Sequence, residues 1–238
     1  MEILIIILPL LASIISGFFG KLIGDRNSEI VTSFLVSITA ILSIFILYEV
    51  VINQYQNNII IATWIHSGSL DVNWSMKIDS LSAVMLVVVT SISSLVHIYS
   101  IGYMSHDPHK PRFMAYLSLF TFAMLMLVTS DNFVQLFFGW EGVGLCSYFL
   151  IGFWFKKDSA NNAAIKAFIV NRVGDFGFAL GIFLIFYLFG TVNYSEVFQK
   201  IPAIQEQNLS FLGIETNAID LTSKPKNDKF LSTIVGIC

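Results

Sequence analysis

An acidic residue in the middle of an apolar segment is the clearest candidate for chemistry in this sequence. Glu141 lies within a mostly apolar run from about Phe133 to Phe155. A carboxylate inside a run long enough to span a membrane costs about 2.5–3.5 kcal/mol on insertion scales. Buried acids in helix bundles pair with other groups, and they are typical of proton and cation transport. We therefore take Glu141 as the first candidate site residue.

Three more charged residues, Lys166, Arg172 and Asp175, occupy the next apolar run, which extends from about Ala163 to Phe189. Arg172 and Asp175 are three positions apart, so they share one face of a helix and can pair. Counted from the start of this run at about 1.5 Å per residue, they lie about 14 and 18 Å into the helix, close to mid-membrane. Arg172 stays protonated and would tune a neighbouring acid. Lys166 could tune an acid or carry a proton itself.

Two functions are open for these groups when only the residue types are considered. The first is a structural network in which the charges hold helices together. The second is a row of titratable groups that moves protons or cations. A carboxylate can load and release a proton because burial raises its pKa and a neighbouring cation lowers it. The apolar composition around the charges favours transport.

The rest of the sequence predicts the membrane scaffold that positions these groups. Hydrophobic residues make up 55% of its 238 residues and charged residues 12%, whereas about 25% of a soluble domain is charged. The predicted fold class is all-α, a polytopic transmembrane helix bundle of six complete helices plus the start of a seventh. The six complete runs are 3–19, 30–52, 81–103, 113–130, 133–155 and 163–189, and the incomplete one is 230–238. We interpret the last run as a helix within which the chain stops.

The segment 53–78, between the second and third helices, has a different pattern. Apolar and polar residues alternate from Leu70 to Met76, directly after a turn that contains Gly68. This period of two predicts a small β-hairpin. Asp79, which comes directly after the hairpin, is suited to cap the third helix.

Basic residues in the short loops predict the orientation in the membrane. They come after the first, third and fifth helices and are Lys21, Arg26, Lys110, Arg112, Lys156 and Lys157. Loops rich in Lys and Arg stay on the cytoplasmic or matrix side. We therefore expect the N-terminus, the hairpin and the segment 190–229 to face the opposite, outer side.

The third helix carries a polar stripe formed by Thr90, Ser94 and His97, which share one helix face. The stripe could hold water within the membrane. Alternatively, its hydroxyls bond back to helix carbonyls and His97 lies near the inner surface. Both interpretations stay open from the sequence.

Other classes of site find little support. The net charge is −3 and no basic patch favours a nucleic-acid partner. The two cysteines, Cys146 and Cys238, lie in apolar runs without the spacing of metal ligands, so we expect both to be small buried hydrophobic residues. We expect no metal site.

Several motifs taken together resemble the NADH dehydrogenase subunit 5 family, whose bacterial counterpart is NADH-quinone oxidoreductase subunit L. The strongest is the run from Phe137 to Trp154, which contains Trp140-Glu141-Gly142-Val143-Gly144-Leu145-Cys146-Ser147-Tyr148. The other matching stretches are 78–82, 96–104 and 166–175. The resemblance covers about residues 1–196.

The resemblance implies a subunit in the membrane arm of respiratory complex I, a proton-translocating NADH:ubiquinone reductase. Carried over by motif, Glu141 matches the glutamate of the fifth helix, and Lys166, Arg172 and Asp175 match charged positions of the sixth. Protons would move through these groups, coupled to electron transfer from NADH to quinone. No cofactor is expected in this chain, since FMN, iron–sulfur clusters and quinone belong to other subunits. The expected partners are other membrane-arm subunits, protons and the lipid bilayer of the bacterial or mitochondrial inner membrane.

The resemblance also implies a division at residue 112. Residues 1–112 would form the first three helices with the hairpin, and 113–238 would begin the antiporter-like repeat that translocates protons. In this family a lysine on the seventh helix pairs with the glutamate of the fifth, and that position lies beyond Cys238. The chain alone is therefore expected to be inactive.

Two alternatives accompany this prediction. One is the large subunit of a multisubunit Na⁺/H⁺ antiporter, which shares the Trp-Glu pair but should lack the continuation from Gly142 to Tyr148 seen here. The other is a structural membrane scaffold for other subunits.

Overall fold

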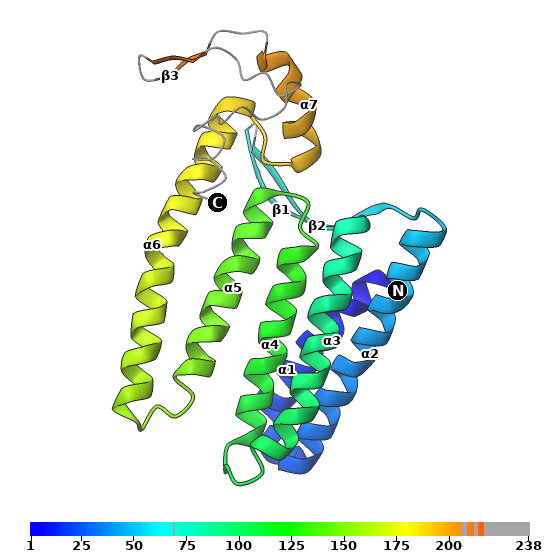
Figure 1. Cartoon of the computed structure of the whole chain (residues 1–238), viewed down its shortest axis with the longest axis vertical. Coiled ribbons are helices and arrows are strands. Elements are labelled where there is room, and N and C mark those ends of the chain that lie inside the picture. Colours follow the sequence, from blue (N-terminus) through cyan, green and yellow to red (C-terminus); the bar gives the residue numbers. More distant parts are fainter. Residues whose placement is uncertain (69, 206–208, 212–213, 217–238) are drawn as a thin grey trace.

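The computed structural model describes residues 1–68, 70–205, 209–211 and 214–216, and six long helices lie side by side in it (Figure 1). All six are long and apolar enough to cross a membrane, which confirms the predicted helix bundle. Their bounds are α1 (Glu2–Ile23), α2 (Asp25–Ile52), α3 (Ser80–Tyr103), α4 (Lys110–Val128), α5 (Phe133–Ile151) and α6 (Asp158–Phe189). The predicted seventh run, 230–238, lies outside the described residues.

Two helices start earlier than the apolar runs indicated. Helix α2 begins at Asp25 rather than Ile30, and α6 begins at Asp158 rather than Ala163. Both early turns are polar and carry an acidic residue, which the positive end of the helix dipole stabilises. A search by hydropathy therefore misses them. The cap predicted at Asp79 is confirmed, since its carboxylate accepts a hydrogen bond from the Ser82 amide at 2.8 Å.

The segment between α2 and α3 forms the predicted hairpin. Its strands β1 (Asn57–Ser67) and β2 (Leu70–Ile78) pair antiparallel, and Gly68 takes a positive φ of 60° in the turn. The β2 side chains that face the bundle, Val72, Met76 and Ile78, are buried. The hairpin therefore continues the apolar core at one end of the helices.

Two polar side chains attach the hairpin to the start of α5. Gln135 is fully buried; its Nε2 donates to the Ser75 carbonyl at 2.7 Å and its Oε1 accepts from the Ser75 amide at 3.0 Å. Asn132 caps α5 by accepting from the Gln135 amide at 2.8 Å, and it donates to the Asn73 carbonyl at 2.9 Å. Strand β2 therefore fixes the position of the N-terminal turn of α5.

A short helix and two short strands occupy the start of the segment expected to be a loop. They are α7 (Tyr194–Gln205), β3 (Leu209–Phe211) and β4 (Ile214–Thr216). Helix α7 is amphipathic, with Val197 buried and Phe198 exposed. Twelve residues with mixed polarity give no membrane-length signal, which explains why hydropathy did not predict α7.

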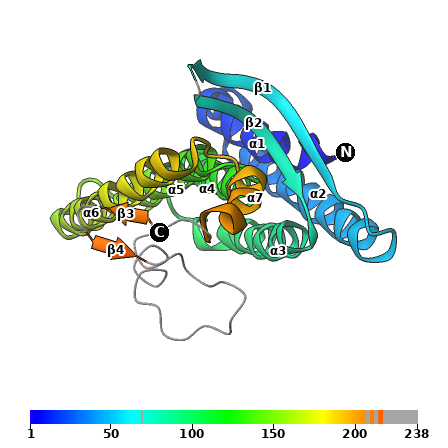
Figure 2. The ribbon, with the colours of Figure 1, turned by 90° about the horizontal axis from the view of Figure 1, so that it is seen from above.

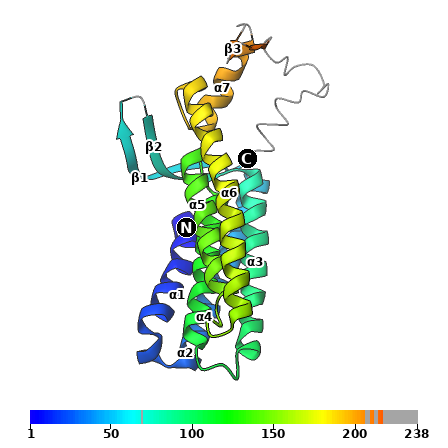
Figure 3. The ribbon, with the colours of Figure 1, turned by 90° about the vertical axis from the view of Figure 1, so that its left-hand side faces the viewer.

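The loops divide between two ends of the bundle. The loops after α1, α3 and α5 lie at one end, here called the basic end because it holds the six basic residues of the predicted inner loops (Figure 1). The hairpin and α7 lie at the other, here called the hairpin end (Figure 3). Helix α4 packs against α1, α2, α3 and α5, whereas α6 packs chiefly on α5. Helix α6 therefore forms one edge of the bundle (Figure 2).

The buried Gln135 bridge predicts a specific loss of stability. Gln135→Met keeps the volume but leaves the buried amide and carbonyl of Ser75 without partners, which costs about 1–3 kcal/mol. Thermal unfolding of the full-length protein should occur at a lower temperature. Gln199→Met, at an exposed position of α7, is the matched control and should change little. Equal unfolding temperatures for the two variants would contradict the bridge.

Candidate functional site

Glycines allow α5 to approach α4 closely. A Cβ on Gly139 would lie 2.7 Å from Leu127 Cα, and a Cβ on Gly142 would lie 3.0 Å from Ala123 Cβ. The first distance is too short for any side chain, so α5 touches α4 at backbone level. In α6, by contrast, a Cβ on Gly174 would meet nothing within 4 Å, so this glycine makes no close contact among the described residues.

Glu141 and Arg172 face each other between α5 and α6. Arg172 Nη1 donates to Glu141 Oε1 at 2.6 Å and to Oε2 at 2.5 Å. Glu141 lies near the middle of α5 and Arg172 near the middle of α6. The predicted agreement in depth between the two helices is therefore confirmed.

Asp175 completes the network from the next turn of α6. Its Oδ2 lies 3.6 Å from Arg172 Nη1, and its Oδ1 accepts a hydrogen bond from Trp140 Nε1 at 2.8 Å. The Asp175 side chain is only 6% exposed, so this hydrogen bond replaces water that the carboxylate has lost. Trp140 and Glu141, which are adjacent on α5, thus bind Asp175 and Arg172, which lie one turn apart on α6.

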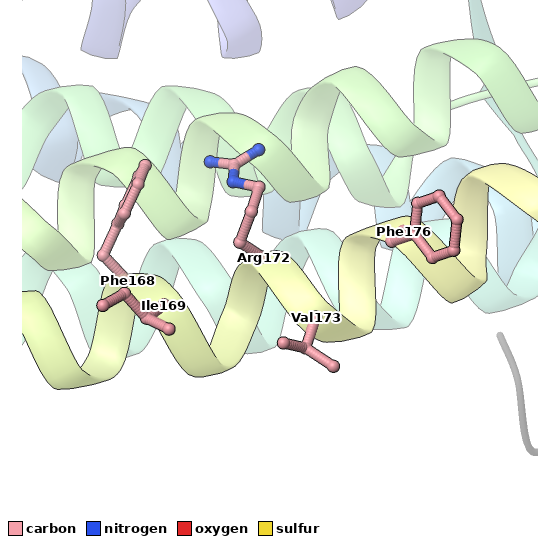
Figure 4. A pocket seen from close by; sticks show the side chains of 5 residues that line it. All are labelled: Phe168, Ile169, Arg172, Val173 and Phe176. Carbon is pink, nitrogen blue, oxygen red and sulfur yellow. The ribbon is translucent and has the colours of Figure 1, made fainter.

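The network is closed on one side and open on the other. The Glu141 side chain is 25% exposed and the Arg172 side chain 48% exposed. Figure 4 shows Phe168 and Arg172 directed toward α5, while Val173 points away from it. The Arg172 guanidinium carbon lies 4.7 Å from the centre of the Phe168 ring, within cation–π range. These side chains line a shallow hollow on α6 with Ile169 and Phe176.

The other sequence-predicted groups lie apart from this network. Lys166 is exposed on α6, six positions toward the basic end from Arg172, and no ion pair joins it to the network within the described part of the chain. Asn171, one turn before Asp175 on α6, is directed toward Gly144 of α5, with its Nδ2 3.9 Å from the Cβ position there. The structure therefore brings together Glu141, Arg172 and Asp175.

The arrangement suits the binding of a single proton. One cation lies between two carboxylates, so the ionised trio carries a net negative charge. A proton on either acid neutralises the trio in an apolar environment, where unbalanced charge is costly. Glu141, which is more exposed and bound only through Arg172, is the better placed of the two acids to exchange a proton.

Sequence reasoning missed Trp140 and Phe168 as members of the site. Their spacing on α5 and α6 carries no signal for a contact between the helices, because aromatic residues are common in apolar helices. Trp140 does adjoin Glu141 in the sequence, and an indole N–H in an apolar run requires an acceptor. That requirement could have indicated a polar partner on a neighbouring helix.

The contact of Gly139 with α4 predicts a steric effect on the site. Gly139→Ala must push α5 away from Leu127, which costs about 1–3 kcal/mol and displaces Glu141 from Arg172. Gly174→Ala, whose added methyl meets nothing within 4 Å, is the matched control. Unfolding temperatures of the full-length protein should fall for the first variant and stay unchanged for the second. A tolerated Gly139→Ala would contradict the backbone contact.

Two tryptophans that each bind an aspartate allow the hydrogen bond to be tested. Trp140→Phe removes the donor to the buried Asp175 and should cost about 1.5–3 kcal/mol, the range for bonds to charged groups. Trp154 Nε1 donates to Asp107 at 2.9 Å in an exposed loop, where water can replace it, so Trp154→Phe should cost less than about 1 kcal/mol. Thermal unfolding of the full-length variants measures both. Equal losses would show that burial of Asp175 does not strengthen its bond.

Two family models match the chain. The model described as NADH-Ubiquinone oxidoreductase (complex I), chain 5 N-terminus, matches residues 64–114. The model described as NADH:quinone oxidoreductase/Mrp antiporter, TM, matches residues 130–221 and so contains the whole acid–arginine network.

Curated proteins from several lineages are similar to almost the whole chain. NADH-ubiquinone oxidoreductase chain 5 of Arabidopsis thaliana is 55% identical over 221 residues, 93% of this chain and 33% of the relative. The same chain of Chondrus crispus is 51% identical over 94% of this chain and 34% of the relative. NADH-quinone oxidoreductase subunit L of Rhodobacter capsulatus is 50% identical over 93% of this chain and 32% of the relative. The chain thus spans about a third of the length of the curated relatives it matches.

Solved structures share the fold at low identity. A chain of the Mrp complex from Dietzia sp. DQ12-45-1b matches 99% of this chain and 22% of its own length, with a TM-score of 0.72 and 19% identity. A chain of the archaeal membrane-bound sulfane sulfur reductase matches 82% of this chain and 39% of its own length, with a TM-score of 0.72 and 18% identity. The chain belongs to the NADH-ubiquinone oxidoreductase chain 5 / NADH-quinone oxidoreductase subunit L family, because it is about 50% identical to members of this family over most of its residues.

Proposed function

We propose that this chain serves in the membrane arm of a proton-pumping NADH:quinone oxidoreductase and moves protons through Glu141 and Asp175, with Arg172 as the cation that tunes them. The observation that carries the proposal is the bridged network at the middle of α5 and α6. Placing ionisable groups at this depth in a membrane costs free energy, so their presence indicates a role in transport or assembly. The family relationship supports transport coupled to electron transfer.

The proton chemistry rests on a movable cation. A carboxylate holds a proton when it is desolvated and releases it when a cation lies against it. Arg172 already contacts Glu141, so a change in that contact, or the approach of a second cation, alters the affinity of the acid for a proton. Lys166 lies on the same helix, toward the basic end, and is our candidate for the group that passes a proton to this site. The lysine that the family places on a seventh helix would approach the open flank of the network.

The remaining parts of the proposal concern the assembly. Residues 1–112 form a helical support, and residues 113–238 begin the translocating repeat. The redox cofactors, FMN, iron–sulfur clusters and quinone, are bound by other subunits, and the chain contacts neighbouring membrane-arm subunits and lipid. By the positive-inside rule, the basic end faces the bacterial cytoplasm or mitochondrial matrix, and the protein lies in the inner membrane.

Charge-neutral substitutions test the role of the two acids. Glu141→Gln and Asp175→Asn keep the shape of the side chains but cannot carry a proton through the carboxylate. In full-length protein within its assembled complex, we expect both to lower the number of protons pumped per NADH oxidised in proteoliposomes, with Glu141→Gln reducing it more. Asp158→Asn, at the exposed start of α6, is the matched control and should pump normally.

The outcomes separate the alternatives. A normal proton yield in both variants with assembly intact would refute the proposal. Loss of assembly in both would favour a structural scaffold. The fold shared with a chain of an Mrp complex makes a Na⁺/H⁺ antiporter the second candidate, and this function predicts sodium-dependent proton exchange in vesicles without NADH.

A further inference from the structure

A second set of polar groups is buried among α2, α3 and α4, on the side of the bundle away from α6 (Figure 2). It begins with Glu29, near the start of α2, whose side chain is only 6% exposed. Lys110 Nζ at the start of α4 lies 3.9 Å from Glu29 Oε1, and this oxygen has no hydrogen-bond partner. A polar contact longer than about 3.5 Å is typical of a pair bridged by water.

Two buried serines beside Glu29 are also without partners, Ser28 and Ser33. This distinguishes them from other buried hydroxyls of α2 and α3, which donate to carbonyls of their own helix. Those hydroxyls belong to Thr32, Thr39, Ser43, Thr90 and Ser100. Unpartnered buried polar atoms are rare in proteins and mark sites of bound water. Here they are concentrated within two turns of α2 at the basic end.

The line of polar groups continues toward mid-membrane. Glu29, Ser33 and Ser37 are spaced four positions apart and share one face of α2. Ser37 Oγ lies 2.9 Å from Ser94 Oγ on α3, which shows that this face is directed toward α3. Because α2 and α3 are antiparallel, Ser33 and His97 lie about 6 Å and about 4.5 Å toward the basic end from this contact, at a similar depth.

His97 is fully buried between α3 and α4. Its Nδ1 lies 2.7 Å from the Ser93 carbonyl oxygen, and its Nε2 lies 3.0 Å from Ser118 Oγ. A carbonyl only accepts, so Nδ1 carries the hydrogen, and Nε2 of the neutral ring accepts from the Ser118 hydroxyl.

The same geometry accommodates a proton on Nε2. The protonated ring donates to Ser118 Oγ, and the Ser118 hydroxyl then turns to the carbonyl four positions back in α4, at Met114. Thr121, on the same helix, already bonds in this way to Leu117 at 3.0 Å. His97 can therefore gain and lose a proton through the rotation of one hydroxyl, without a backbone movement.

We propose that Glu29, Ser33 and His97 form a second protonatable track, which binds water and takes up protons from the aqueous phase at the basic end. The entrance is the Glu29–Lys110 pair, where the Lys110 side chain is 20% exposed. A proton from water protonates Glu29 and passes along water held by Ser33 to Ser118 Oγ, whose own hydrogen moves to His97 Nε2. The track goes beyond the function proposed for Glu141 and does not depend on it.

The charges that face the track are few. Glu29 faces Lys110 from α4 and has Asp25 one turn away on α2. The nearby Arg112 is directed to α5, where its Nη2 donates to the Phe153 carbonyl at 3.1 Å. From His97 to the end of α3 the sequence contains no other charged residue. Glu29 is therefore the acid best placed to influence a proton on His97.

The bound water is tested directly by an electron cryomicroscopy map of the full-length protein in its complex, at a resolution that shows water. We expect a water within about 2.7–3.2 Å of Glu29 Oε1 and another beside Ser33 Oγ. Ser33→Ala should remove the second water. A map of this quality with no water at either atom would overturn the proposal.

The proton is tested by infrared difference spectra between pH values, recorded on resting complex in H₂O and D₂O. We expect an imidazole band that titrates and is absent in His97→Gln. Glu29→Gln should lower its midpoint by about one pH unit, the effect of one charge about 10 Å away at an effective dielectric constant of about 20. Ser43→Ala, a buried serine of α2 bonded to the Thr39 carbonyl, should leave the midpoint unchanged.

The two measurements are interpreted together. A titrating His97 whose midpoint responds to Glu29 supports the track. Water without any titration of His97, or a midpoint that Glu29→Gln does not move, overturns it, because the waters would then only complete hydrogen bonds. The resting enzyme pumps no protons, so these results are independent of the outcome for Glu141 and Asp175.

Discussion

The bridge from Arg172 to Glu141 is the interaction on which the site depends. Without the guanidinium, Glu141 and Asp175 would lie between α5 and α6 without a countercharge. Burying a carboxylate that has lost its ionic partner is strongly destabilising. With the guanidinium, the two helices are held together at mid-length, which matters for α6 because this helix packs chiefly on α5. The bridge adds to the apolar contact between Phe137 of α5 and Phe178 of α6, which also joins the two helices.

Such a bridge works only if α5 is held rigidly at both ends. At the hairpin end, the side chains of Asn132 and Gln135 bond to β2. At the basic end, Arg112 of α4 donates to the Phe153 carbonyl just after α5 and lies 4.6 Å from the centre of the Phe153 ring. Between these points Gly139 lets the backbones touch. Glu141 thus sits on a helix that is held at both ends, while Arg172 sits on a helix that packs chiefly on one neighbour.

The sequence predicted the features that composition along a single helix determines, and it failed where two helices determine the outcome. Six apolar runs, the alternation in 70–76 and the shared depth of Glu141 and Arg172 are local patterns, so they were readable. The Trp140–Asp175 bond was not, because it requires the rotation of α5 relative to α6. Hydropathy did not predict the first turn of α6, because this turn contains the charged Asp158. The same charge stabilises the turn, since it lies at the positive end of the helix dipole. The close contact at Gly139 was not readable either, because it depends on how α5 faces α4.

The two buried polar systems differ in what can reach them. The Glu141 network is open sideways, since Arg172 is half-exposed at mid-helix, so groups on a neighbouring helix can approach it and change its charge balance. The His97 system lies among α2, α3 and α4, where His97 is fully buried, and we place its entrance at the Glu29–Lys110 pair. A lateral opening suits a site that must respond to a moving partner. A track that begins at a nearly buried acid beside a partly exposed lysine suits equilibration with one aqueous phase. Because α4 packs against both α3 and α5, a proton that changes the hydrogen bonds of Ser118 acts on the helix against which Gly139 and Gly142 place the α5 acid.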